Sequence, residues 1–236
     1  MSSWAADFVA SQLLLKPDSI LGLPTGKTPM NMYQYLVEMY RQNKISFKYV
    51  QTYNIDEFLD IEPDNPISYR SYMNNNFFNK IDIDRQFTYI PPSNPKNPSS
   101  AVDWYEKIVT SQPADLQILG IGTNGHIGFN EPGERLEEST HVTELAEETI
   151  TSNQQLIEQT LGLDSSEAQI PSKAITMGIG TILRAKKILL LASGTEKQPV
   201  LKQLLSSGIT TYLPASFLKL HSSVTIIADK FAYPDE

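Results

Sequence analysis

The sequence contains no cysteine, and this absence excludes both disulfide bonds and metal sites built from thiolates. It also lacks any apolar run close to the roughly 20 residues that a membrane-spanning helix needs. The first residues, MSSWAADFVASQLLLK, carry neither a basic leader nor a small-residue cleavage site, so we expect no signal peptide. Together these absences predict a protein of the reducing cytoplasm.

Positive charge is scarce as well. The 19 Lys and Arg residues face 27 Asp and Glu residues, which gives a formal net charge of −8. This balance argues against nucleic acid or an anionic membrane as a partner, because the overall field repels both. An anionic small-molecule ligand would have to be held by local positive groups. With 236 residues, 40% of them hydrophobic, the chain can bury a full core, and we expect one domain over residues 1–236.

Short apolar runs alternate with helical patterns along the chain. The runs predict strands at 19–23, 47–55, 115–121, 173–179, 187–192 and 223–228. Helices are predicted at 2–16, from 28 to about 40, and at 66–80, 99–110, 147–161 and 195–206. Strands that are apolar throughout are typical of sheets covered on both faces. The pattern therefore predicts a three-layer, doubly wound α/β fold with a mainly parallel sheet.

The first two predicted helices have recognisable starts. Behind Ser2 and Ser3, the first helix places Trp4, Phe8 and Leu15 on one face, which indicates a capped amphipathic helix. The second is expected to begin with Thr28 as its N-cap and Pro29 in its first turn.

Three loops that follow predicted strands could carry chemistry, and ligands of open parallel sheets bind at that edge. The first is LPTGKTP (23–29), in which the glycine allows close backbone approach and the helix start presents free amides. We therefore predict an anion site from Thr25, Gly26, Lys27 and Thr28. An ordinary strand-to-helix turn could contain the same residue types.

The second loop, YNIDEFLD (53–60), places two carboxylates directly after an apolar strand. One of them, Asp56 or Glu57, could act as a general base if it is partly removed from water. A helix cap or a solvated acidic turn would explain the same residues without chemistry.

The third loop, LGIGTNGHIGFNEPG (119–133), is rich in glycine and gathers an imidazole, two amides and a carboxylate. His126 is the best acid–base candidate among the three histidines, because an imidazole titrates near about 6.5 and Glu131 or Asn124 could fix its tautomer. His141 and His221 lie in less informative settings. No second histidine or carboxylate stands at ligand spacing, so we predict no metal site.

These loops, with several other blocks, resemble the glucosamine-6-phosphate deaminase family. The resemblance extends over nearly the whole chain and rests on LGLPTGKTPMNMYQYLVEM, YNIDEF, PISYRSYMNNNFF, LGIGTNGHIGFNEPG, SGTEK and PASFLKLH. The family implies a three-layer, Rossmann-like α/β fold, in agreement with the pattern of strands and helices. It also implies an enzyme without metal or redox cofactor that opens an amino-sugar ring, moves a proton from carbon 2 to carbon 1, and releases ammonia.

The resemblance also implies roles for individual residues. Asp56 matches the base that moves the carbon 2 proton, and His126 matches the group that opens the ring. Glu131 matches the carboxylate that orients this imidazole, and Asn124 matches a position that is Asp or Asn in the family. With Asn, the imidazolium loses one neighbouring negative charge. Lys197 in SGTEK matches the lysine that binds the substrate phosphate, with the TGKT loop supplying amides.

The chain departs from the family pattern at two positions near the expected phosphate. Gln155 stands where many members carry an arginine that reaches the phosphate, and Lys27 stands where many have Gly, Ser or Ala. The ending ITTYLPASFLKLHSS is also similar to the galactosamine-6-phosphate isomerase group, so the substrate epimer stays open. Two further alternatives are 6-phosphogluconolactonase, which shares the fold, and a sugar-phosphate sensor without turnover.

Overall fold

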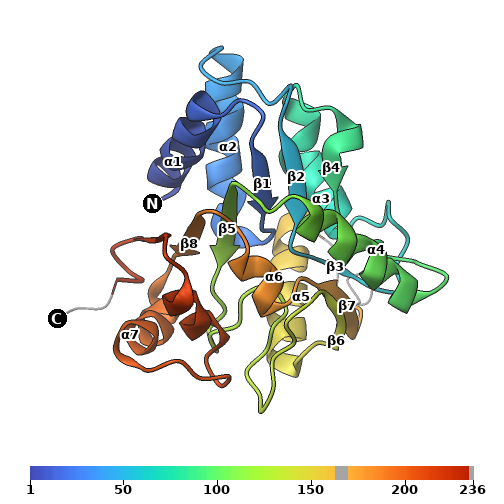
Figure 1. Ribbon diagram of the computed structural model, residues 1–236, viewed down its shortest axis with the longest axis vertical. Coiled ribbons are helices and arrows are strands. Elements are labelled where there is room, and N and C mark those ends of the chain that lie inside the picture. Colours follow the sequence, from blue (N-terminus) through green and yellow to red (C-terminus); the bar gives the residue numbers. More distant parts are fainter. Residues whose placement is uncertain (163–169, 234–236) are drawn as a thin grey trace.

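In the computed structural model, which describes residues 1–162 and 170–233, the chain folds around a six-stranded parallel sheet (Figure 1). The strands lie in the order β4 (Thr88–Tyr89), β2 (Gln51–Asn54), β1 (Ile20–Leu23), β5 (Leu116–Gly120), β8 (Ile188–Ala192) and β9 (Val224–Ala228). Each neighbouring pair is parallel. The predicted α/β class with a mainly parallel sheet is therefore confirmed.

Alternate residues of the central strands enter two apolar cores, one on each face of the sheet. From β8, Leu189 and Leu191 enter the core covered by α1 (Ser2–Leu15) and α2 (Lys27–Arg41). Ile188 and Leu190 enter the other core, covered by α4 (Pro98–Ser111), α6 (Ile179–Leu183) and α7 (Gln198–Ser206). Two covered faces explain why these strands are apolar throughout.

The remaining helices are α3 (Tyr69–Asn76), α5 (Glu147–Leu161) and four short 3₁₀ turns, Phe78–Lys80, Arg85–Phe87, Thr195–Lys197 and Pro214–Leu220. The bounds of α5 match the predicted helix at 147–161. Within residues 1–162 and 170–233, no helix has the length and apolar character needed to cross a membrane.

A second, antiparallel sheet differs from the prediction of one parallel sheet. It consists of β3 (Asp56–Phe58), β7 (Lys173–Thr176) and β6 (His141–Glu144), so the predicted strand at 173–179 does not join the parallel sheet. The hydrogen bonds that fasten this small sheet to the rest of the molecule include Met177 N to Ile55 O (2.8 Å), Phe129 N to Thr176 Oγ1 (3.1 Å), and Asn130 Nδ2 to Met177 O (2.8 Å). The sequence pattern missed the sheet because its strands are short and two of them are polar.

The predicted face of α1 and the predicted N-caps of α1 and α2 are wrong in detail. In α1, Trp4 and Leu15 are 74% and 80% exposed, and no side chain caps the helix. The buried face consists instead of the small or aliphatic residues Ala5, Ala6, Val9, Ala10 and Leu13, whose size allows close approach to α2 and the sheet. Helix α2 begins at Lys27, with Gly26 rather than Thr28 as its N-cap.

The strand order reverses beside β1, and this reversal fixes where a ligand can bind. From β1 the chain moves outward to β2 and β4, whereas β5, β8 and β9 follow on the other side. The loops that leave β1 and β5 therefore diverge and open a crevice between them. Open α/β sheets bind ligands in such a crevice.

Candidate active site

A cavity of about 750 Å³ occupies this crevice, a size within the usual range for small-molecule sites. Its walls come mainly from the loops that follow strands of the parallel sheet. The lining residues are Pro24–Pro29 after β1, Ile55 and Asp56 after β2, Gly120–Thr123 and His126 after β5, Ser193, Gly194, Glu196 and Lys197 after β8, and Asp229 and Phe231 after β9. All three loops singled out from the sequence thus reach one cavity.

One side of the cavity is suited to an anion. Gly26 has a φ of 97°, a conformation that favours glycine, and turns the chain from β1 into α2. The first N–H groups of α2 have no partner within the helix and no side-chain cap, so they are free for a ligand. Lys27 and Lys197 add positive charge from two different loops. Burial lowers the pKa of the Lys197 ammonium, and the carboxylates of Glu196 and Glu148 partly offset this effect.

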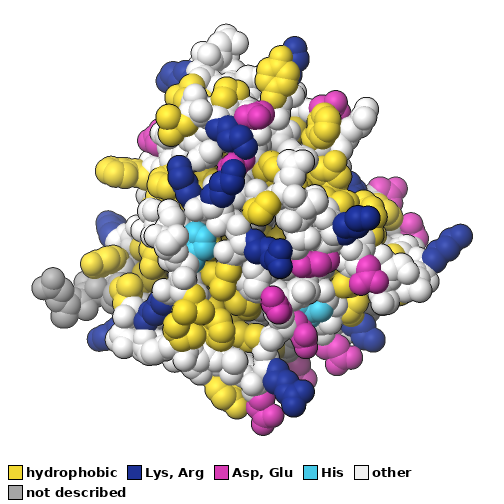
Figure 2. Space-filling model, in the orientation of Figure 1, with side chains coloured by type: hydrophobic (Ala, Val, Ile, Leu, Met, Phe, Trp, Pro, Cys, Tyr) yellow, Lys and Arg dark blue, Asp and Glu magenta, His cyan; other side chains and the backbone are white. Residues whose placement is uncertain are grey.

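One face of the molecule carries charges of both signs. Basic and acidic side chains are interspersed over the face seen in Figure 2, and acidic ones gather toward the side of α4 and β6. Because the net charge is −8, an anion would have to be attracted by local groups, and Lys27 and Lys197 are lysines that line the cavity.

The floor of the cavity holds the carboxyl group of Asp56, the first residue of β3, which is only 7% exposed. Glu57 points to the opposite side of the strand and is 1% exposed. Its carboxylate accepts backbone N–H groups of Phe58 (2.9 Å), Tyr69 (2.8 Å) and Arg70 (2.9 Å), which ties β3 to the start of α3.

Burial, followed by the adjacent Glu57 carboxylate, raises the pKa of the Asp56 carboxyl to about 8. Burial also raises the pKa of Glu57, to about 7, against the lowering effect of its three N–H donors. A carboxylate with a raised pKa beside a cavity is a stronger base than an exposed one. Residue types alone left Asp56 and Glu57 as candidates, and the family resemblance favoured Asp56; of the two, only Asp56 lines the cavity.

The loop after β5 carries His126 and two polar partners. The imidazole Nδ1 lies 3.3 Å from Oε2 of Glu131, and the same oxygen accepts Asn124 Nδ2 at 2.8 Å. Asn124 Oδ1 in turn accepts the backbone N–H of His126 at 3.1 Å. Burial opposes ionisation of Glu131, but His126, Thr149 and Asn124 together lower the pKa of this carboxyl to about 2. A carboxylate held beside an imidazole is an arrangement that can move protons.

Seven of the nine residues predicted for the site line the cavity: Thr25, Gly26, Lys27, Thr28, Asp56, His126 and Lys197. The other two, Glu131 and Asn124, lie behind His126 and contact it. Among the described residues, no group of three His, Asp or Glu side chains is arranged to hold a metal ion.

Apart from Gln155, which was expected near the phosphate, sequence reasoning missed the contribution of α3 and α5. Tyr69 lines the cavity, and its hydroxyl lies 3.2 Å from Oδ1 of Asn153 on α5. Ser152, Asn153 and Gln155 of α5 also line the cavity, and Thr149 contacts Glu131. A polar stripe was visible in the sequence, since Thr149, Ser152 and Asn153 are spaced i, i+3 and i+4 on one helix face. It was overlooked because only loops after strands were searched.

The buried Asp56 carboxyl gives a testable effect on stability. Because its folded pKa is raised, its contribution to stability is fully present below the unfolded pKa of about 3.9 and is lost as the pH rises toward about 8. Asp56→Asn removes this ionisation, so we expect the variant to unfold at a higher temperature than the wild type at pH 8.5. The gain should be at least about 1 kcal/mol, or roughly 2–4 °C, and should vanish near pH 4.

The control is Asp60→Asn, four residues away at an exposed position whose φ of 64° suits asparagine. Melting temperatures of the three proteins at both pH values decide the matter. If Asp56→Asn and the wild type melt alike at pH 8.5, burying the ionised carboxylate carries no cost and the raised pKa is wrong.

Comparison with known proteins places the chain in a family. A protein of Halothermothrix orenii named glucosamine-6-phosphate deaminase is 48% identical over 233 residues, 98% of this chain and 94% of that protein. One of Thermoanaerobacter sp. strain X514 with the same name is 46% identical over 240 residues, 100% of this chain and 92% of that protein.

Solved structures agree with these relatives. A structure described as a monomeric glucosamine-6-phosphate deaminase matches with a TM-score of 0.92 and 41% identity, covering 98% of this chain and 93% of that one. A 6-phosphogluconolactonase of Thermotoga maritima matches with a TM-score of 0.70 and 21% identity, covering 94% of each chain, which is a likeness of fold. The family model for glucosamine-6-phosphate isomerases and 6-phosphogluconolactonase matches residues 9–227. The chain belongs to this family.

Proposed function

We propose that the protein is a glucosamine-6-phosphate deaminase, which converts glucosamine 6-phosphate and water into fructose 6-phosphate and ammonia. The observation that carries this proposal is one cavity that contains a buried carboxyl group, an imidazole paired with a carboxylate, and two lysines. The names of relatives at 46–48% identity over nearly the full chain support the same reaction.

Ring opening is the first step, and we assign it to His126. The imidazole accepts the proton of the carbon 1 hydroxyl and returns a proton to the ring oxygen as the bond between carbon 1 and that oxygen breaks. Since Nδ1 lies beside Glu131, Nε2 is the nitrogen available to the sugar. Glu131 stabilises the transient imidazolium, and Asn124 holds the carboxylate in place.

The carbon chemistry follows, and we assign it to Asp56. Its carboxylate removes the proton from carbon 2 of the open-chain aldehyde and delivers it to carbon 1. A proton of the amine passes to the carbon 1 oxygen, which leaves an alcohol at carbon 1 and an imine at carbon 2. Water adds to this carbon, and ammonia leaves to give the ketone of fructose 6-phosphate. None of these steps requires a metal or a redox cofactor.

The phosphate is the substrate's remote anchor. We assign it to Thr25, Gly26, Lys27 and Thr28 at the start of α2, together with Lys197. Binding energy from a phosphate held there can orient carbons 1 and 2 between Asp56 and His126.

A direct assay tests the function. The purified full chain is incubated in excess chelator with glucosamine 6-phosphate and, separately, with galactosamine 6-phosphate. We expect ammonia and fructose 6-phosphate to form in equal amounts from glucosamine 6-phosphate without any added metal or nucleotide. A strict requirement for a metal would contradict the mechanism.

The same assay separates the alternatives. Faster ammonia release from galactosamine 6-phosphate would assign the other epimer. Hydrolysis of 6-phosphogluconolactone without ammonia release would indicate the lactonase, which the FNEPG segment with Glu131 and the NIDEF loop disfavour. Tight binding without any product would indicate a sensor, although a sensor has no need for a base at carbon 2.

We also infer a cytoplasmic location, a small-molecule amino-sugar phosphate as the partner, and no nucleic-acid or membrane partner. The acidic charge and the cysteine-free sequence support these inferences. For the assembly we infer a monomer or a small homo-oligomer, and the structural match described as monomeric supports the former.

Lys27 is expected to compensate for the arginine that this chain lacks at Gln155, because both side chains line the same cavity. A charge-assisted contact to phosphate contributes about 1.5–3 kcal/mol, or roughly ten- to a hundredfold in affinity. Lys27→Ala should therefore raise the KM for glucosamine 6-phosphate at least about tenfold at moderate salt. Adding Gln155→Arg to Lys27→Ala should recover part of this loss.

The matched control is Lys44→Ala, an exposed lysine outside the cavity, which should change KM by less than about twofold. An unchanged KM for Lys27→Ala would mean that Lys197 and the loop amides bind the phosphate without Lys27.

A further inference from the structure

Thr149 lies outside every role assigned so far, yet it makes a close contact with the acid–base pair. It is in the first turn of α5 and is 3% exposed. Its Oγ1 lies 2.5 Å from Oε1 of Glu131. An ionised carboxylate can only accept hydrogen bonds, so the threonine hydroxyl is the donor.

The two oxygens of Glu131 have separate partners. Oε2 lies toward His126. It accepts a hydrogen bond from Asn124 Nδ2 at 2.8 Å and lies 3.3 Å from the imidazole Nδ1. Oε1 accepts Thr149, its one hydrogen-bond partner among the described residues. Hydrogen bonds to both oxygens fix the rotation of the carboxylate plane. This rotation sets the distance and angle between Oε2 and the imidazole Nδ1. The contact to His126 is long and leaves Nδ1 without a well-aligned hydrogen bond, so a small rotation of the carboxylate changes it.

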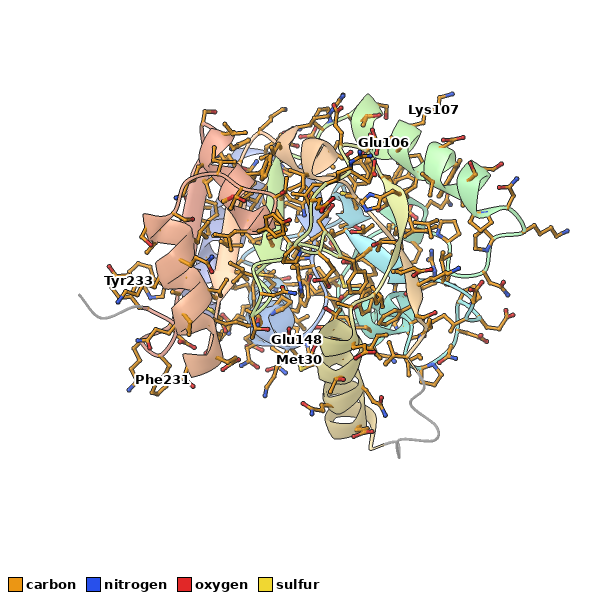
Figure 3. The ribbon with its side chains drawn as sticks, turned by 90° about the horizontal axis from the view of Figure 1, so that it is seen from below. Met30, Glu106, Lys107, Glu148, Phe231 and Tyr233 are labelled. Atoms are coloured by element: carbon orange, nitrogen blue, oxygen red, sulfur yellow. The ribbon has the colours of Figure 1, made fainter. Side chains whose placement is uncertain are left out.

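Helix α5 connects this contact to the substrate cavity. One turn beyond Thr149, Ser152 and Asn153 line the cavity, followed by Gln155. The first turn of α5, marked by Glu148 in Figure 3, is seated against the body of the molecule, while the far end of the helix projects away from it. Glu148 is itself bound there, since its Oε1 accepts Thr123 Oγ1 at 2.8 Å. A shift of α5 against the cavity would therefore move Thr149, and with it the Glu131 carboxylate that Thr149 contacts.

We propose that Thr149 is a positioning residue for ring opening, which holds the Glu131 carboxylate in the orientation that serves His126 and links that orientation to the seating of α5. The inference rests on the proposed function, because it concerns the step assigned to His126. A hydroxyl that only satisfies a buried carboxylate would affect folding. A positioning residue affects one chemical step.

The experiment uses three variants of the full chain and two substrates. Thr149→Val keeps the shape of the side chain and removes the donor, Thr149→Ser keeps the donor, and Thr151→Val alters an exposed threonine of the same helix whose Oγ1 donates to Glu147 O. The substrates are glucosamine 6-phosphate, whose ring must open, and its 4,5-dideoxy analogue, which lacks both ring-closing hydroxyls and stays open.

We expect Thr149→Val to lower kcat for glucosamine 6-phosphate on the order of tenfold with KM nearly unchanged. The variant loses the hydrogen bond to the charged Glu131 carboxylate, and this loss affects only ring opening. Exchange of the carbon 2 proton of the open-chain analogue with solvent deuterium should keep the wild-type rate. Thr149→Ser should restore kcat, and Thr151→Val should not change it.

Two results would overturn the inference: a wild-type kcat for Thr149→Val, or an equal loss on both substrates, which would indicate general damage. If Thr149→Val does not fold, Thr149→Ala is compared with Thr149→Ser by the same two measurements. Failure of the proposed function is a separate result, since in that case the wild-type protein itself releases no ammonia.

Discussion

Asp56→Asn is expected to abolish exchange of the carbon 2 proton of glucosamine 6-phosphate with solvent deuterium, while leaving substrate binding within about twofold. Asparagine keeps the shape of the side chain and removes only the basic oxygen. The wild-type carboxyl is buried at the cavity floor with a pKa raised to about 8, which suits it to remove a proton from carbon. General-base catalysis contributes about 10²- to 10⁴-fold, and we expect a loss of this size in kcat.

The measurement is proton exchange by NMR in deuterium oxide, with binding followed separately by calorimetry. Asp60→Asn, the exposed control, should exchange at the wild-type rate. Exchange at that rate in Asp56→Asn would remove Asp56 from the mechanism and direct attention to Glu57. That outcome would be difficult to reconcile with the structure, because the Glu57 carboxylate accepts three backbone N–H groups and does not line the cavity.

His126→Gln is expected to lower kcat for glucosamine 6-phosphate by at least about 10²-fold, because glutamine cannot carry a proton between the carbon 1 hydroxyl and the ring oxygen. The open-chain 4,5-dideoxy analogue needs no such transfer, so its carbon 2 exchange should fall far less. The ratio of the two rates is the measurement. It separates ring opening from the carbon chemistry assigned to Asp56.

The control is His141→Gln on β6, where the imidazole is partly exposed and Nδ1 contacts the carbonyl of Ser139. This variant should retain activity on both substrates. Equal losses on both substrates in His126→Gln would move His126 from ring opening to a later step, and the role of Glu131 beside it would have to change accordingly.

The parallel sheet and its ligand-binding edge could be predicted from the sequence because both depend on local patterns. Apolar runs such as 188–192 are visible as buried strands, and glycine-rich loops after them are visible as ligand loops. The helical pattern at 147–161 likewise matched the bounds of α5. The convergence of Lys27, Asp56 and His126 on one cavity then followed from the rule that strand ends meet at one edge, whereas Lys197 was expected there only from the family resemblance.

Features that depend on contacts distant in sequence could not be predicted in this way. The antiparallel sheet pairs Asp56 with Thr176, 120 residues later in the chain, and no local pattern specifies that pairing. Trp4 was expected to be buried because it is large and apolar, but close helix packing selected alanine instead. The contact of Thr149 with Glu131 likewise joins two segments that only the folded chain brings together.

The division of the molecule into two sheets has a consequence for protein engineering. Asp56 belongs to the small antiparallel sheet, whereas His126 belongs to a loop of the parallel sheet. Hydrogen bonds made by Met177, Phe129 and Asn130 help to join these two bodies. A graft of loop 119–133 onto another parallel scaffold would therefore transfer the acid–base pair without its partner base. The smallest transplantable unit also contains residues 55–58 and 141–144 and the strand at 173–177.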